Sequence, residues 1–201
     1  MLISERGKSL RRFSRSGLLS AAIQGIPKTK KKGQGGLLGL ALHIDFKHNN
    51  LVYFSYMEKR KGSYDTEVTA GVLRGNSLMN VKTIFMALED PGSGRHHFSS
   101  RLLFAADVTL FISLSDRGGK KFAQDLNDHR GSLIRINDGA YILVDNPFFK
   151  DKNTLSAIYS YGHRNIQDMS VHRLSSAILT HENGPQDGDE INIIKPGANY
   201  G

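Results

Sequence analysis

The sequence contains no cysteine in its 201 residues. This absence excludes disulfide bonds, catalysis by a thiolate and zinc sites built on cysteine. It does not identify the compartment, because many proteins of the periplasm also lack cysteine. Long apolar runs are missing too: no segment approaches the roughly 18–20 residues that a helix needs to cross a bilayer, so no membrane span is expected. Met1 leads directly into a segment typical of a strand and turn, and no signal peptide is recognisable.

Positive charge is in excess, with 27 Lys and Arg against 19 Asp and Glu, a formal net charge of +8. Such a balance invites a nucleic-acid partner. Much of the excess lies in residues 6–15 and 28–32, and aromatic residues do not alternate with it as a base-stacking surface requires. We therefore interpret these runs as solvated loops and expect no nucleic-acid partner.

Short apolar segments recur along the chain, separated by turn residues that include many of its 21 glycines. The pattern shows no long amphipathic helix, so the sequence predicts an all-β protein. Short antiparallel strands of this kind build propellers, sandwiches and barrels, and periodicity alone leaves all three open. The segments expected to contain strands are 2–13, 33–46, 51–57, 66–73, 81–87, 101–105, 109–114, 131–138, 157–162 and 176–180.

Two loop residues have side chains suited to acid–base chemistry. His97 follows His96 in a loop, and a histidine placed there can act as a general base. Asp116 comes directly after an expected strand, where a carboxylate can orient an imidazole and stabilise its protonated form. Taken singly, each has an ordinary alternative: a surface histidine and an aspartate that makes a turn.

Three other loops carry groups that bind ligands. Gln34 lies in a glycine-rich turn, where backbone and amide can approach a flat ligand, although a plain tight turn explains the same residues. Arg164 and Asn165, with Gly162 and His163 directly before them, form a cationic-amide corner suited to negative charge. The carbonyl groups of Gly184 and Pro185, just before an acidic run, are oxygen ligands of the kind that calcium takes.

In this order the segments resemble the soluble PQQ (pyrroloquinoline quinone)-dependent sugar dehydrogenases of the glucose/sorbosone dehydrogenase family. The resemblance covers essentially the whole chain and implies a six-bladed β-propeller, of which residues 1–201 would form a single partial propeller domain of about three to four blades. The matching segments are GQGGLLGLALHIDF, LVYFSY, HHFSSRLLFA, LFISLSDRG, HRGSLIRIND, DNPF, IYSYGHRNIQ and GPQDGDEINIIKPGANYG.

The resemblance also implies roles for the loop residues in oxidising an aldose at C1 to a lactone. His97 would remove the proton of the C1 hydroxyl while a hydride passes to PQQ, and Asp116 would support His97. Arg164 would lie over the quinone, with Asn165 and Gln34 as further cofactor contacts.

Calcium and the remaining partners are implied in the same way. Gly184 and Pro185 match carbonyl ligands of a calcium ion that polarises PQQ, and Glu190 and Tyr200 match positions associated with a second, structural calcium. An external electron acceptor and a periplasmic location follow from the resemblance, and a homodimer is a further expectation.

Departures from the family pattern favour an alternative. The family continues well beyond Gly201 with later blades, so we expect a partial propeller that binds PQQ poorly when it folds alone. The alternative is an inactive propeller fragment acting as a calcium-binding or protein-binding module. Val108, Ser115 and Asp168 stand where turn glycines are expected, and a non-glycine residue at positive φ costs about 1 kcal/mol or more.

Overall fold

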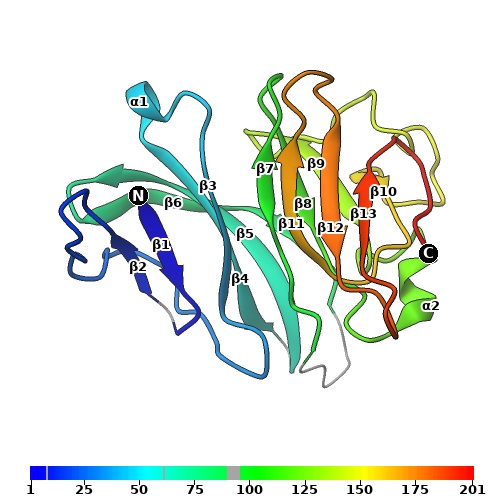
Figure 1. Cartoon of the computed structure of the whole chain (residues 1–201), viewed down its shortest axis with the longest axis horizontal. Helices are drawn as coiled ribbons and strands as arrows, with labels where there is room; N and C mark the ends of the chain where they lie inside the picture. The colour runs from blue at the N-terminus through cyan, green and yellow to red at the C-terminus, as the bar shows by residue number, and fades with distance from the viewer. Residues whose placement is uncertain (8, 61, 90–95) are drawn as a thin grey trace. The chain divides into compact units, whose positions relative to one another are not determined.

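A computed structural model describes residues 1–7, 9–60, 62–89 and 96–201. Within these ranges it contains thirteen strands and two helices of four residues each (Figure 1). The expected all-β class is therefore confirmed. The chain divides into two compact units, Met1–Ser93 and Gly94–Gly201. The expectation of a single domain over 1–201 stays a prediction.

The N-terminal unit contains a hairpin and a four-stranded antiparallel sheet. Its core gathers buried aliphatic and aromatic side chains such as Val52, Phe54 and Leu73. The hairpin pairs β1 (Leu2–Glu5) with β2 (Ser9–Arg12). The sheet has the order β3 (Leu37–Leu42), β4 (Leu51–Arg60), β5 (Ser63–Arg74) and β6 (Ser77–Met86), with helix α1 (Phe46–Asn49) between β3 and β4.

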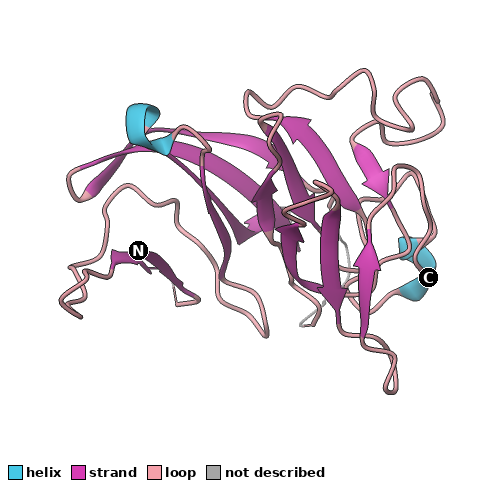
Figure 2. Ribbon diagram, turned by 45° about the horizontal axis from the view of Figure 1, so that its top comes forward, coloured by secondary structure: helices cyan, strands magenta, loops and turns pink. Residues whose placement is uncertain are grey.

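The C-terminal unit contains two antiparallel sheets (Figure 2). Its core includes Phe111, Leu133 and Ile166, and Phe111 packs edge-on against Tyr159. The first sheet has the order β10 (Ile158–Ser160), β9 (Leu133–Asn137), β8 (Thr109–Ser113) and β7 (Leu102–Phe104), with α2 (Lys120–Ala123) between β8 and β9. The second sheet has the order β11 (Ile166–Val171), β12 (Ile178–Glu182) and β13 (Glu190–Ile193).

Every segment expected to contain a strand has one, but strands β11 and β13 were not expected. Two of the six residues of β11 are buried and none of the four of β13 is, so neither shows the apolar run that marks a half-buried strand. Neither α1 nor α2 has a side-chain N-cap, and with four residues each they are single helical turns.

Of the three residues that stand where the family has a turn glycine, Val108, Ser115 and Asp168, only Val108 has a positive φ. Val108 has φ 66°, in the turn between β7 and β8, and a β-branched residue is disfavoured there. Asp107 supports this turn, because its Oδ1 accepts the N–H of Thr109 at 3.1 Å. The expectation was wrong for Ser115 and Asp168, which are not among the non-glycine residues with positive φ.

Candidate functional site

His97 and Asp116 are brought together by the extension of the β7–β8 pairing. Arg101, just before β7, and Ser113, at the end of β8, are joined by a backbone hydrogen bond of 3.1 Å. The chain continues outward from this pair on both sides, until the Nδ1 atom of His97 lies 2.5 Å from Oδ1 of Asp116. His97 has φ 51°, a conformation that most residues avoid, and strain of this kind often occurs at functional sites.

Oδ1 of Asp116 is a buried atom that takes part in two hydrogen bonds. The Asp116 side chain is 3% exposed, and the one of His97 is 17% exposed. Oδ1 also accepts the N–H of Gly118 at 2.8 Å. With the Asp116 oxygen as acceptor, Nδ1 of His97 donates this bond, and a neutral imidazole then has its lone pair on Nε2. This is the tautomer that a general base needs.

A backbone hydrogen bond joins this pair to the Arg164–Asn165 corner. The N–H of Asp116 donates to the carbonyl of Arg164 at 2.9 Å. The guanidinium Nη1 of Arg164 donates to the carbonyl of Asn183 at 2.7 Å. Asn165 is buried, and its Oδ1 accepts from the hydroxyl of Ser115 at 2.9 Å. The His97–Asp116 pair and the Arg164–Asn165 corner thus belong to one network of hydrogen bonds.

Behind this corner lies a buried polar group that joins His163 to two residues that sequence reasoning did not find, Ser160 and Glu182. Nδ1 of His163 lies 2.9 Å from Oε1 of Glu182, and Nε2 of His163 lies 2.8 Å from Oγ of Ser160. Burial by itself would raise the pKa of Glu182, but hydrogen bonds from His163 and from the backbone of Arg164 and Asn165 hold that pKa below its usual value. The available signal was Glu182 itself, an acidic residue two positions beyond a strand expected to end at Thr180.

A pocket of about 480 Å³ opens against these residues. Its volume is in the range of small-molecule and cofactor sites. Six of the predicted site residues line it: Asp116, Arg164, Gly184, Pro185, Glu190 and Tyr200. His97 and Asn165 are not lining residues, but His97 is bonded to Asp116, and Asn165 follows Arg164. Gln34 is exposed in the N-terminal unit, and its expected cofactor contact stays a prediction.

The pocket wall combines cationic and anionic groups. Lys120 and Arg164 supply positive charge, whereas Asp116, Glu182 and Glu190 supply carboxylates. Tyr200 presents an aromatic ring that stacks on His163 with 4.8 Å between ring centroids. This donor set fits a flat ligand that bears carboxylates and is accompanied by a hard cation.

The loop expected to bind calcium is a tight turn at the edge of this pocket. The N–H of Gly184 donates to Oδ1 of Asp189 at 3.0 Å, and the carbonyl of Pro185 accepts the N–H of Gly188 at 3.0 Å. The Tyr200 hydroxyl is bonded to backbone groups of Ile193 and Lys195, both at 2.8 Å. The described residues contain no cluster of three or more His, Cys, Asp or Glu side chains suited to a metal ion. Calcium binding here would therefore depend mainly on backbone carbonyls.

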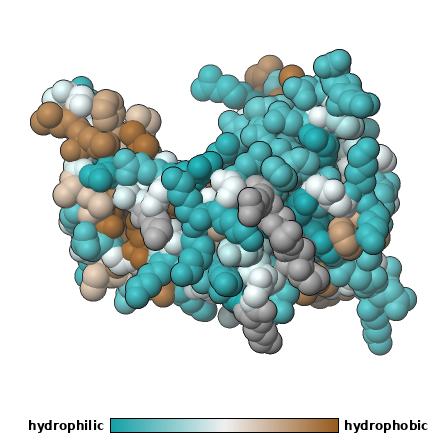
Figure 3. All heavy atoms as spheres, turned by 90° about the horizontal axis from the view of Figure 1, so that it is seen from below, coloured by the Kyte–Doolittle hydropathy of each residue, from teal (hydrophilic) through white to brown (hydrophobic). Residues whose placement is uncertain are grey.

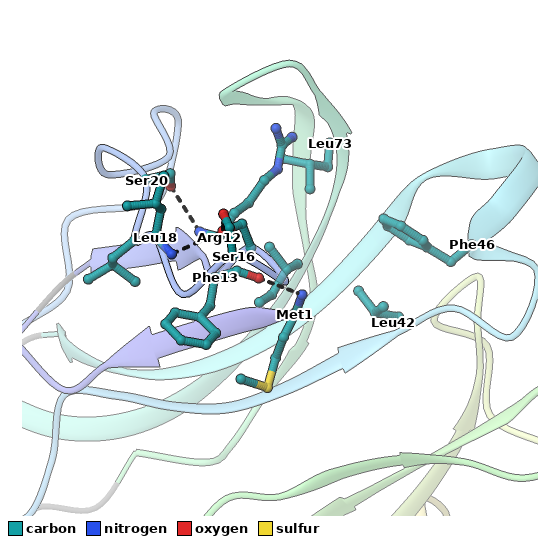
Figure 4. A pocket seen from close by; sticks show the side chains of 12 residues that line it. Met1, Arg12, Phe13, Ser16, Leu18, Ser20, Leu42, Phe46 and Leu73 are labelled. Carbon is teal, nitrogen blue, oxygen red and sulfur yellow. Dashed lines mark hydrogen bonds between the residues drawn. The ribbon is translucent and has the colours of Figure 1, made fainter.

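The N-terminal unit has an apolar pocket of about 650 Å³ (Figure 4). Leu18, Leu42 and Phe46 are among its lining side chains, and the N-terminus of Met1 donates to the carbonyl of Phe13 at its edge. In the space-filling view, residues coloured as hydrophobic gather at the left, on the surface of this unit (Figure 3). The described lining of the pocket contains no histidine or carboxylate. No helix in the described ranges is long and apolar enough to span a membrane.

The sequence of the chain matches a known protein family over its whole length. The model of the glucose/sorbosone dehydrogenase family matches residues 1–201. Aldose sugar dehydrogenase YliI of Escherichia coli is 38% identical over the whole chain, which covers 55% of that protein. The chain therefore spans about half the length of this relative.

Two solved structures extend the comparison to the fold. The apo form of the soluble aldose sugar dehydrogenase from Escherichia coli superposes with a TM-score of 0.95 at 38% identity, over 100% of this chain and 58% of that one. The PQQ-bound aldose sugar dehydrogenase from Streptomyces coelicolor superposes with a TM-score of 0.87 at 27% identity, over the same shares. The antiparallel sheets of this chain are thus part of a β-propeller of this type. The chain belongs to the glucose/sorbosone dehydrogenase family of PQQ-dependent enzymes.

Proposed function

We propose that the chain supplies the catalytic base and part of the cofactor site of a PQQ- and calcium-dependent aldose dehydrogenase. The observation that carries the proposal is the 2.5 Å pair of His97 and Asp116, joined by a backbone hydrogen bond to the Arg164 corner of a cofactor-sized pocket. A histidine hydrogen-bonded to a carboxylate, beside a pocket to which Arg164 and Lys120 contribute positive charge, suits the removal of a proton from a sugar hydroxyl.

In the proposed reaction the aldose loses the hydride on C1 and the proton of the C1 hydroxyl, and becomes a lactone. Nε2 of His97 takes the hydroxyl proton, and Asp116 stabilises the imidazolium that forms. PQQ, when bound, supplies the acceptor for the hydride that leaves C1. An external acceptor would then remove the two electrons, and we propose the periplasm as the location of this exchange.

Arg164 and Asn165 would bind the cofactor, because a guanidinium suits carboxylates and developing negative charge. The carbonyls of Gly184 and Pro185 would hold calcium near it, with Glu190 and Tyr200 as the candidate second site. Both pairs line the pocket that Arg164 lines, which supports their assignment to one cofactor site.

The test is reconstitution of residues 1–201 with PQQ and calcium. Cofactor binding is followed by fluorescence titration, and turnover by reduction of an artificial dye with glucose and other aldoses. His97→Ala should abolish turnover and leave PQQ binding in place, whereas His96→Ala, at the exposed neighbour, should change neither. Absence of PQQ binding and turnover would overturn the proposal for this chain. Calcium binding without either would favour the non-catalytic binding module instead.

A further inference from the structure

Glu182 is a buried carboxylate that touches the backbone of both residues of the cofactor corner. It ends strand β12, and its side chain is 2% exposed. Oε2 accepts the N–H of Arg164 at 2.7 Å and the N–H of Asn165 at 3.2 Å. One oxygen atom of Glu182 therefore fixes two consecutive peptide groups of the corner.

These two contacts occur where the strand pairing is irregular. The pairing of β11 with β12 starts at Ile166 and Glu182, and its register shifts before Asp168. Arg164 and Asn165 precede β11, so their N–H groups lie outside its ladder. The Glu182 side chain accepts both N–H groups in place of a strand carbonyl. Its contacts therefore determine the backbone path of the corner.

The second oxygen of Glu182 is held as firmly as the first. Oε1 lies 2.9 Å from Nδ1 of His163 and accepts from Nδ2 of Asn192 at 3.2 Å. His163 is fully buried between its bond to Ser160 and the ring of Tyr200. Since both oxygens are occupied by groups of this chain, Glu182 holds the wall of the pocket in place.

We propose that Glu182 is the positioning residue that fixes Arg164 and Asn165 and thereby sets the affinity of this pocket for PQQ, an inference that rests on the proposed function. The Arg164 side chain extends from the fixed backbone to Asn183, and the Asn165 side chain reaches Ser115. Release of the backbone would move both side chains together. Glu182 acts through Arg164 and Asn165, whereas the reacting sugar would meet His97.

The first arm of the test measures the corner without any cofactor. Hydrogen exchange of the Arg164 and Asn165 amides should accelerate in Glu182→Met, which keeps the length of the side chain but removes the acceptors. Glu182→Gln should retain protection, because its amide oxygen still accepts both N–H groups while its NH₂ meets His163 in the other tautomer. Thr180→Val is the matched control on the same strand, since the Thr180 hydroxyl is buried with no hydrogen-bond partner among the described residues.

Thermal unfolding of each variant checks that it folds. If Glu182→Met does not fold, Glu182→Asp replaces it, because a carboxylate about 1.5 Å shorter loses one of its two sets of contacts. Amides that stay protected in these variants would overturn the proposal. Amides that lose protection equally in Thr180→Val would overturn it as well, since the effect would then be a general loosening of β12.

The second arm titrates PQQ, with calcium present, into wild type, Glu182→Met, Arg164→Ala and the double variant. Glu182→Met should weaken PQQ binding about tenfold or more, as loss of outer-shell partners does at metal sites. In the Arg164→Ala background the same change should have a much smaller effect. Equal fold-changes in both backgrounds would show that Glu182 does not act through Arg164 and would overturn the inference.

Failure of the proposed function gives a different pattern. A wild-type chain that binds no PQQ overturns the cofactor assignment and the affinity statement with it. Amide exchange in the first arm still decides whether Glu182 fixes the corner.

Discussion

Replacement of Asp116 by asparagine separates the two effects that this carboxylate has on His97. Oδ1 of Asp116 accepts both from Nδ1 of His97 and from the N–H of Gly118. The Gly118 N–H only donates, so an asparagine at position 116 must keep its oxygen there. The imidazole therefore keeps its proton on Nδ1, and Asp116→Asn removes the negative charge without changing the tautomer.

The lost charge sets the size of the expected effect. His97 becomes cationic when it takes the sugar proton, and two unit charges about 4 Å apart interact by about 4 kcal/mol at an effective dielectric constant of 20. That energy corresponds to about 10³ in rate. Because the His97 side chain is 17% exposed, water screens part of the interaction. We expect turnover to fall by about 10²- to 10³-fold in Asp116→Asn.

The assay is dye reduction by the PQQ- and calcium-loaded protein at saturating aldose, together with ¹⁵N NMR of the imidazole nitrogens. Asp151→Asn is the matched control: Oδ1 of the exposed Asp151 accepts the N–H of Asn153 at 2.9 Å, the same turn geometry as in Asp116. A rate within about twofold of wild type would refute the electrostatic argument. A proton found on Nε2 of His97 would refute the argument about the tautomer.

Three further predictions concern stability. Burial lowers the pKa of His129 from 6.5 to about 4, although nearby Asp128 opposes the shift, so the unfolded chain binds the proton first and stability falls on acidification from pH 6.5 to 4. At about 1.4 kcal/mol per pKa unit, the wild-type chain should lose about 3 kcal/mol of stability over this range. Urea unfolding of His129→Gln should show no such loss, and a pH dependence equal to that of the wild type would contradict the prediction. Gly162→Ala should lower stability by about 2 kcal/mol in thermal unfolding, because φ is +83° and the added Cβ meets Asn199 and nearby backbone; an unchanged melting temperature would contradict this. Tyr56→Phe removes the 2.8 Å hydrogen bond from the hydroxyl to the buried Glu67 and should lower the free energy of unfolding by about 1–3 kcal/mol. Chemical denaturation measures this change, and an unchanged free energy of unfolding would contradict the prediction.

The strands were predictable where apolar residues alone define them. Strand β8 is buried at all five positions and β4 at six of ten, so hydrophobic pattern and structure agree. Strand β13 has no buried residue and pairs only with β12 in its sheet. Its position depends on the pairing of His181 with Ile191, a contact between segments that local propensity does not encode.

The candidate site shows the same contrast between residues that the sequence singles out and contacts that only the fold creates. The sequence singled out His97, Asp116 and Arg164 by their residue types and by the family resemblance, and their roles stay predictions. Glu182 was not found, because its role arises only when the end of β12 meets the backbone before β11. Polar residues that bond across a fold leave no local pattern, and the family resemblance did not include this one.

The hydrogen bonds of the C-terminal unit couple the base to the cofactor corner at two independent places. One is the backbone bond from Asp116 to the carbonyl of Arg164, and the other is the side-chain bond from Ser115 to Asn165. Two consecutive residues after β8 thus hold two consecutive residues before β11. A displacement of the base-supporting carboxylate must therefore move the arginine with it. The spacing between His97, the proposed base, and Arg164, the proposed cofactor contact, is therefore set by hydrogen bonds within residues 96–201.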